Sequence, residues 1–169
     1  MTKYRATIAV VGVLLTLKAI SAIAGESFSA KVVAVSDGDT ITVLDESNWQ
    51  HKIRLQGIDA PEKRQPYGQR AKSHLSDLVF SKRVELDCGK TDRYSRKICI
   101  VRLDGLDVNL EQVRAGMAWW YVQYQNEKKV VQREAYRLAE QDARREKRGL
   151  WSDSKAIAPW DYRRSHRTK

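Results

Sequence analysis

The chain has 169 residues, of which 42 % are hydrophobic. This is enough for one domain with a buried core and too few for two domains of ordinary size. A formal net charge of +10 suits a polyanionic partner such as DNA or RNA, although charge alone does not establish one.

The first 24 residues have the pattern of a secretory signal peptide. Lys3 and Arg5 precede an apolar run over residues 6–17, and small residues up to Ala24 give an Ala-x-Ala cleavage pattern. The alternative is an uncleaved membrane anchor, but Lys18 leaves the run shorter than the roughly 20 residues of a spanning helix. We expect cleavage after Ala24, export to a periplasm or out of the cell, and no stable membrane association. The mature chain would then carry about +7, since the leader holds three basic residues and no acid.

Three short strands are predicted at the start of the mature chain. Residues 28–36 and 40–45 are rich in β-branched side chains and flank Asp37-Gly38, a strong hairpin signal. Residues 49–56, "WQHKIRLQ", alternate apolar and polar side chains and place Arg54 on the polar face. The next stretch, "GIDAPEKRQPYG", has two prolines and two glycines and is predicted to be a loop.

The rest of the chain predicts two more strands, over 83–88 and 97–103, and three helices. The helices are expected over 69–80, over a short stretch capped by Asn109, and over a charged stretch from 127 to 148. The buried side of the last helix is expected to carry Val130, Val131, Tyr136, Leu138 and Ala143. Five strands with a helix after the third permit an α+β fold: an OB-fold, five-stranded antiparallel β-barrel with three α-helices. We assign residues 25–153 to this domain and expect the basic residues 154–169 to form a flexible tail.

Cys88 and Cys99 flank a predicted turn. In an oxidising compartment two such cysteines can form a disulfide; the alternative is two small buried side chains in adjacent strands. Because export is predicted, we expect the disulfide. Two cysteines and few histidines make a structural zinc site improbable.

Several charged residues fall at predicted strand ends and in loops, where functional sites gather. They are Asp39, Arg54, Asp59, Glu62 and Arg96. Each has a simpler interpretation, as a turn residue, a side chain lying over the sheet, or part of a solvated loop. Together they supply what phosphodiester hydrolysis needs. Aspartate oxygens suit Ca²⁺ or Mg²⁺, guanidinium groups bind phosphate, and one further carboxylate could activate water.

Five stretches resemble, in the same order, the staphylococcal (micrococcal) nuclease or thermonuclease family. They are "VSDGDTITV", "IRLQGIDAPE", "TDRYSRKICIV", "DVNLEQVRAGMAWWY" and "REKRGLWSD". The resemblance runs over residues 30–153, nearly the whole mature chain. It implies an OB-type barrel with three helices and a Ca²⁺-dependent endonuclease. Members of this family cut DNA and RNA at the 5′ oxygen and leave 3′-phosphate ends.

The resemblance also implies roles for residues of this chain. Calcium would be held by Asp39, Asp59 and the backbone carbonyl of Ala60. The catalytic residues would be Arg54 and Arg96 on phosphate, with Glu62 as the general base. Tyr94 would lie against the nucleotide, and Tyr124 matches a second such tyrosine, although the aromatics around it also suit a core. Ser95 stands where the family has glycine, which matters if that position needs a positive φ.

Two other classes of function stay open at this point. One is a catalytically inactive OB-fold module that binds nucleic acid; the other is a structural periplasmic protein. The five charged residues named above argue against the first and would be unexplained in the second. We expect a monomer that acts on DNA and RNA with little sequence preference, because the predicted site binds phosphate rather than base edges.

Overall fold

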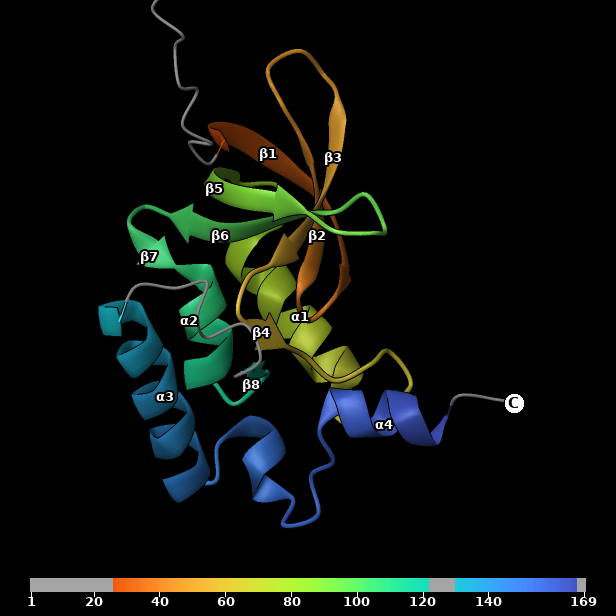
Figure 1. Ribbon diagram of the computed structural model, residues 1–169, viewed down its shortest axis with the longest axis vertical. Helices are drawn as coiled ribbons and strands as arrows, with labels where there is room; N and C mark the ends of the chain where they lie inside the picture. The colour runs from red at the N-terminus through yellow and green to blue at the C-terminus, as the bar shows by residue number, and fades with distance from the viewer. Residues whose placement is uncertain (1–25, 122–129, 167–169) are drawn as a thin grey trace, which may run out of the picture.

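The computed structural model describes residues 26–121 and 130–166, which form a closed barrel with helices packed at one end (Figure 1). Five strands make the barrel: β1 (Glu26–Asp37), β2 (Thr40–Leu44), β3 (Gln50–Leu55), β5 (Arg83–Thr91) and β6 (Lys97–Leu103). Their order is β3-β2-β1-β5-β6, and β3 pairs with β6 to close it. The predicted OB-type barrel is therefore confirmed, with one difference: the closing β3–β6 pair is parallel.

Three short strands extend this framework. The strand β7 (Leu106–Asp107) pairs with the end of β6. A separate two-stranded sheet joins β4 (Ile58–Asp59) to β8 (Trp119–Trp120), with Asp59 opposite Trp119. This small sheet gives the loop after β3 a regular backbone where the sequence predicted none.

Helices follow one another across one end of the barrel (Figure 1). They are α1 (Gly68–Val79), α2 (Val108–Arg114), α3 (Val130–Arg145), the 3₁₀ helix η2 (Gly149–Ser152) and α4 (Pro159–Ser165). The core lies between the barrel and α1, where Val32, Ile41, Ile53 and Leu75 are completely buried. Among the described residues there are four α-helices, one more than the three predicted, because α4 forms within residues expected to be a flexible tail.

The tail prediction is corrected by the packing of α4. Pro159, at the start of the helix, is buried and has a φ already suited to a first helical turn. Trp160 stacks on Tyr121, with ring centroids 5.3 Å apart. Basic composition suggested a solvated tail, but these apolar contacts fix residues 159–165 against the domain.

The short helix α2 is capped differently from the prediction. Asp107, not Asn109, is the N-cap and accepts a hydrogen bond from the backbone N–H of Leu110 at 3.0 Å. Asn109 is fully buried, accepts from the N–H of Val101 at 3.0 Å, and donates to backbone carbonyl groups of β6 and the β3–β4 turn. Asn109 thus joins α2 to β6 and to the turn that follows β3, the strand that carries Arg54.

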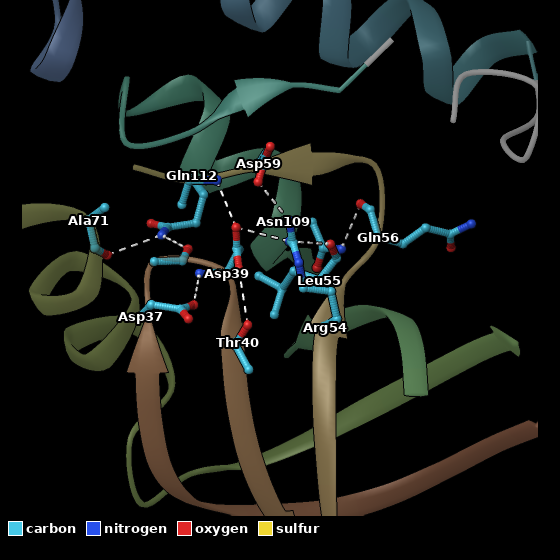
Figure 2. Close-up of polar contacts among 12 residues, drawn as sticks. Asp37, Asp39, Thr40, Arg54, Leu55, Gln56, Asp59, Ala71, Asn109 and Gln112 are labelled. Carbon is cyan, nitrogen blue, oxygen red and sulfur yellow. Dashed lines mark hydrogen bonds and ion pairs between the residues drawn. The ribbon is translucent and has the colours of Figure 1, made fainter. Parts of the chain in front are cut away.

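Gln112 on α2 fixes the turn that precedes Asp39. Its side-chain amide donates to the carbonyl of Gly38 at 2.6 Å and to that of Ala71 at 3.2 Å (Figure 2). A Cβ on Gly38 would lie 2.6 Å from the Cβ of Ala71 and 2.7 Å from that of Ala60. Glycine is therefore required here by close packing, and the turn is held rigidly against α1.

Cys88 and Cys99 are paired residues of β5 and β6 and form a disulfide. We expect reduction of this bond to lower the free energy of unfolding by about 3 kcal/mol, because it closes a short loop in the unfolded chain. Chemical denaturation with and without reductant measures the change. The variant Cys88→Ala/Cys99→Ala should not respond to reductant. Two free thiols, found by alkylation and mass measurement of protein from an oxidising compartment, would refute the bond.

Some of the predictions fall outside the described residues and side chains, among them the burial expected for Val130 and Val131. The signal peptide over residues 1–24 and the candidate nucleotide-stacking residue Tyr124 both lie there. Within the described part of the chain, no helix is both long and apolar enough to cross a membrane.

Candidate active site

Asp39 lies between β1 and β2, where the Asp37-Gly38 turn presents it at the barrel rim. The carboxylate of Asp37 accepts a hydrogen bond from the N–H of Asp39 at 3.1 Å, a side-chain contact that shapes the turn. Asp39 itself is only 6 % exposed and accepts from the Thr40 hydroxyl at 3.0 Å. Asp37 and Gly38 bend the chain, as the hairpin signal predicted, and this bend places Asp39 in the lining of a cleft.

Arg54 joins the two predicted metal-binding aspartates (Figure 2). It stands opposite Thr40 in the β2–β3 ladder, so its side chain emerges next to Asp39. One guanidinium nitrogen lies 3.0 Å from Oδ2 of Asp39, and the other lies 2.9 Å from Oδ1 of Asp59. The structure thus brings two carboxyl groups together from separate parts of the chain. Asp39 binds Ala60, 21 residues away, and Asp59 binds Arg54, five residues away.

The backbone of Ala60 completes this group. Its N–H donates to Oδ2 of Asp39 at 2.7 Å, and the neighbouring Asp59 is 1 % exposed. Hard oxygen donors of this kind fit Ca²⁺ or Mg²⁺, which also take backbone carbonyl and water oxygens. Among the described residues, no cluster of three or more His, Cys, Asp or Glu side chains with metal-binding geometry is present. The two carboxylates of Asp39 and Asp59 are oxygen donors of the kind that a hard cation takes, and such a cation would need further oxygens beside them.

Burial raises the pKa of Asp39 from its ordinary value of 3.8 to about 8. Arg54 opposes the rise, while the nearby carboxylates of Asp37 and Asp59 add to it. A buried carboxyl group poised in this way exchanges its proton for a cation when one binds.

This shift predicts a pH dependence of stability. Between about pH 4 and pH 8 the folded chain keeps a proton on Asp39 that the unfolded chain has lost. The free energy of unfolding should therefore fall as pH rises through this window, by up to about 1.4 kcal/mol per pH unit. Urea denaturation in chelator should show the wild-type value falling relative to that of Asp39→Asn. A constant difference across the window would contradict the shift.

Glu62 lies at the edge of the same site and is paired with an arginine that the sequence analysis did not single out. Arg163, on α4, donates to Oε1 of Glu62 at 2.6 Å and to Oδ2 of Asp59 at 2.7 Å. Partial burial disfavours the charged form of this guanidinium. Its hydrogen bonds to Asp59 and Glu62 outweigh that effect and raise the pKa of Arg163 above its ordinary value. The signal in the sequence is the basic stretch "DYRRSHR", whose composition instead predicts a solvated tail.

Arg96 lies in the loop between β5 and β6 and is held by Asp92. Its Nε donates to Oδ2 of Asp92 at 2.8 Å, and its N–H donates to Oδ1 at 3.0 Å. Tyr94 is 62 % exposed, with the guanidinium groups of Arg93 and Arg96 over its ring. This loop and the Asp39–Arg54–Asp59 group line one cleft of about 1400 Å³, together with Glu62 and Arg163.

Ser95 has a φ of 59°, so the position does require the left-handed conformation that glycine adopts freely. We expect Ser95→Gly to raise the free energy of unfolding by at most about 1 kcal/mol, because relief of strain is partly offset by the greater freedom of glycine in the unfolded chain. Urea denaturation measures this gain. A clear loss of stability would show that the serine is not strained.

The fold and cleft define the class of protein: an OB-type barrel with paired acidic and basic groups at its rim. A family model described as "Staphylococcal nuclease homologue" matches residues 52–153, which include Arg54, Asp59, Glu62 and Arg96. An "Uncharacterized endonuclease" of Haemophilus influenzae is 41 % identical over 154 residues, covering 91 % of this chain and 83 % of the relative. A "Micrococcal nuclease" of Shigella flexneri is 37 % identical over 155 residues, covering 86 % of each. "Protein ParB" of Escherichia coli is 41 % identical over 143 residues, covering 79 % and 78 %.

The chain belongs to the staphylococcal nuclease family. It is a nuclease, and so a hydrolase, as the fold and the family together establish. The sequence resemblance to this family is confirmed.

Proposed function

We propose that the protein is an exported, Ca²⁺-dependent endonuclease that hydrolyses DNA and RNA and leaves 3′-phosphate ends. The observation that carries the proposal is the buried arrangement of Asp39 and Asp59 on either side of the Arg54 guanidinium. A relative named micrococcal nuclease, with 86 % of each chain covered, supports the same activity.

Asp39, Asp59 and the backbone carbonyl of Ala60 would hold the calcium ion. When bound there, Ca²⁺ neutralises charge on the phosphoryl oxygens of the substrate. The turn fixed by Gln112 and the ladder position of Arg54 keep these groups in place before substrate arrives. Such preorganisation is what makes charged groups effective in the transition state.

The arginines and Glu62 carry the proposed hydrolysis. Arg54 and Arg96, which both line the cleft, bind the phosphate, since planar guanidinium groups match phosphate oxygens with paired hydrogen bonds. Glu62 accepts a proton from the attacking water, whose oxygen bonds to phosphorus as the bond to the 5′ oxygen breaks. The products are a 3′-phosphate and a 5′-hydroxyl, which takes its proton from solvent. Exposed Tyr94 supplies a surface for the nucleotide.

Export is supported by the leader pattern of residues 1–24 and by the Cys88–Cys99 disulfide, which persists in oxidising compartments. The proposed location is therefore a periplasm or the medium. We propose that the mature chain acts as a monomer.

The proposal is tested by incubating the purified mature chain with DNA or RNA, with Ca²⁺ or with chelator, and identifying the ends of the products. We expect cleavage of both polymers with Ca²⁺, none with chelator, and 3′-phosphate ends. Binding of nucleic acid without cleavage under any metal condition would instead establish the inactive OB-fold module.

A further inference from the structure

The segment that contains α4 is fastened beside the cleft by contacts that do not involve the predicted site residues. The buried side chain of Gln65 donates to the carbonyl of Ile157 at 2.6 Å. Trp160 stacks on Tyr121, and Pro159 is buried. In Figure 1, α4 lies near the beginning of α1, below the barrel. These contacts set the position from which Arg163 reaches the cleft.

Arg163 occupies both oxygens of Asp59. Its two terminal nitrogens lie 3.2 Å from Oδ1 and 2.7 Å from Oδ2. Arg54 already binds Oδ1 at 2.9 Å, so this buried carboxylate is shared between two guanidinium groups. A metal ion at this carboxylate would therefore meet two positively charged groups that already bind its oxygens.

The same guanidinium also engages Glu62, at 2.6 Å from Oε1. While Oε1 of Glu62 accepts this charge-assisted hydrogen bond, it is occupied by Arg163 rather than by a water molecule. One side chain from the far end of the chain, 104 residues from Asp59 and 101 from Glu62, therefore covers both a proposed metal ligand and the proposed base.

We propose that Arg163 is an internal cation that competes with the divalent metal ion for Asp59 and holds the active site in an inactive form until that ion binds. This inference rests on the proposed function. By thermodynamic reciprocity, an ion that displaces Arg163 must loosen α4, and loosening α4 must tighten binding of the ion. The freed Arg163 remains at the cleft, where the phosphate chain of the substrate offers it another partner.

The neighbouring Arg164 provides a matched control. It carries the same charge on the same helix and also lines the cleft, but its ion pair is with Asp161 of its own helix. Removing Arg164 therefore changes the local charge without changing the contacts of Asp59 or Glu62. Any effect specific to Arg163→Ala must come from those contacts.

The test is titration of wild type, Arg163→Ala and Arg164→Ala with CaCl₂ by isothermal calorimetry. We expect Arg163→Ala to bind Ca²⁺ roughly tenfold more tightly than wild type, as loss of charge-assisted hydrogen bonds implies. Arg164→Ala should stay within about twofold of wild type. In wild type, saturating Ca²⁺ should also speed hydrogen exchange at the backbone amides of Asp161 and Tyr162, which hydrogen-bond to Ala158.

Equal or weaker Ca²⁺ binding by Arg163→Ala, or unchanged exchange in α4, would overturn the inference. If Arg163→Ala fails to fold by circular dichroism, Trp160→Ala decides, since it frees α4 without touching the carboxylates and should also tighten Ca²⁺ binding. Cleavage of DNA by wild type with Ca²⁺, measured in parallel, separates the two proposals. If wild type cleaves DNA while wild type and Arg163→Ala bind Ca²⁺ equally tightly, only the role of Arg163 is refuted. If wild type does not bind Ca²⁺ and does not cleave DNA, the proposed function is refuted, and this inference with it.

Discussion

Replacing Arg54 by alanine is expected to lower the rate of Ca²⁺-dependent DNA cleavage by about a thousandfold. The guanidinium lies between Asp39 and Asp59, so it enters the cleft at the point where the phosphate would meet the proposed metal ligands. Loss of one preorganised donor to developing charge costs about 10²- to 10³-fold, and Arg54 offers two. Single-turnover cleavage at saturating DNA and Ca²⁺ measures the loss.

Arg54→Ala should also destabilise the metal-free protein, because the buried carboxyl groups of Asp39 and Asp59 lose the guanidinium that binds both of them. The expected cost is about 3 kcal/mol in the free energy of unfolding. Calcium should restore part of it, since an ion bound to the folded state stabilises that state. Denaturation with Ca²⁺ and with chelator measures both effects.

Arg54→Lys is the matched control for the loss of activity. It keeps the positive charge but cannot bind both carboxylates, or two phosphate oxygens, with a planar fork. Compared with Arg54→Ala, we expect Arg54→Lys to regain more of the lost stability than of the lost cleavage rate. Cleavage by Arg54→Ala at the wild-type rate would remove Arg54 from the active site.

Replacing Glu62 by glutamine should lower the cleavage rate by about 10²- to 10⁴-fold, the contribution of a positioned general base. Glutamine keeps the size of the side chain but cannot accept the proton of water. The Glu62 side chain is 40 % exposed, so the fold should tolerate the change. Single-turnover rates at saturating DNA separate this chemical defect from weaker binding.

The control is Glu146→Gln, which removes an exposed carboxylate. Glu146 forms ion pairs with Arg145 and Arg148 and does not line the cleft. It should cleave at the wild-type rate. If Glu62→Gln also does so, another group must activate the water.

Local patterns in the sequence predicted the barrel well, because strand alternation and turn chemistry are short-range properties. The Asp37-Gly38 turn and the strand carrying Arg54 appear where expected, and α1 is displaced by one residue at each end. The five charged site residues gather in one cleft for the same reason: each lies at or near a strand end that the barrel brings to its rim.

Contacts between distant segments were not predictable in this way. The pairing of Arg163 with Asp59 depends on where the chain returns after α3, which no local pattern encodes. Asn109 resembled a cap, but its buried amide serves the barrel instead. Leu138, expected on the buried side of α3, is 46 % exposed, because α3 packs mainly through α2 rather than against the barrel itself.

The central claim is that Asp59 holds the catalytic metal ion of a nuclease. It is tested most directly by a calcium titration of DNA cleavage by wild type and Asp59→Asn side by side. We predict that wild-type cleavage rises with Ca²⁺ to a plateau and stops in chelator, and that Asp59→Asn is at least about a hundredfold slower throughout. Wild-type cleavage that persists in chelator, or equal rates for the two proteins, would contradict the claim.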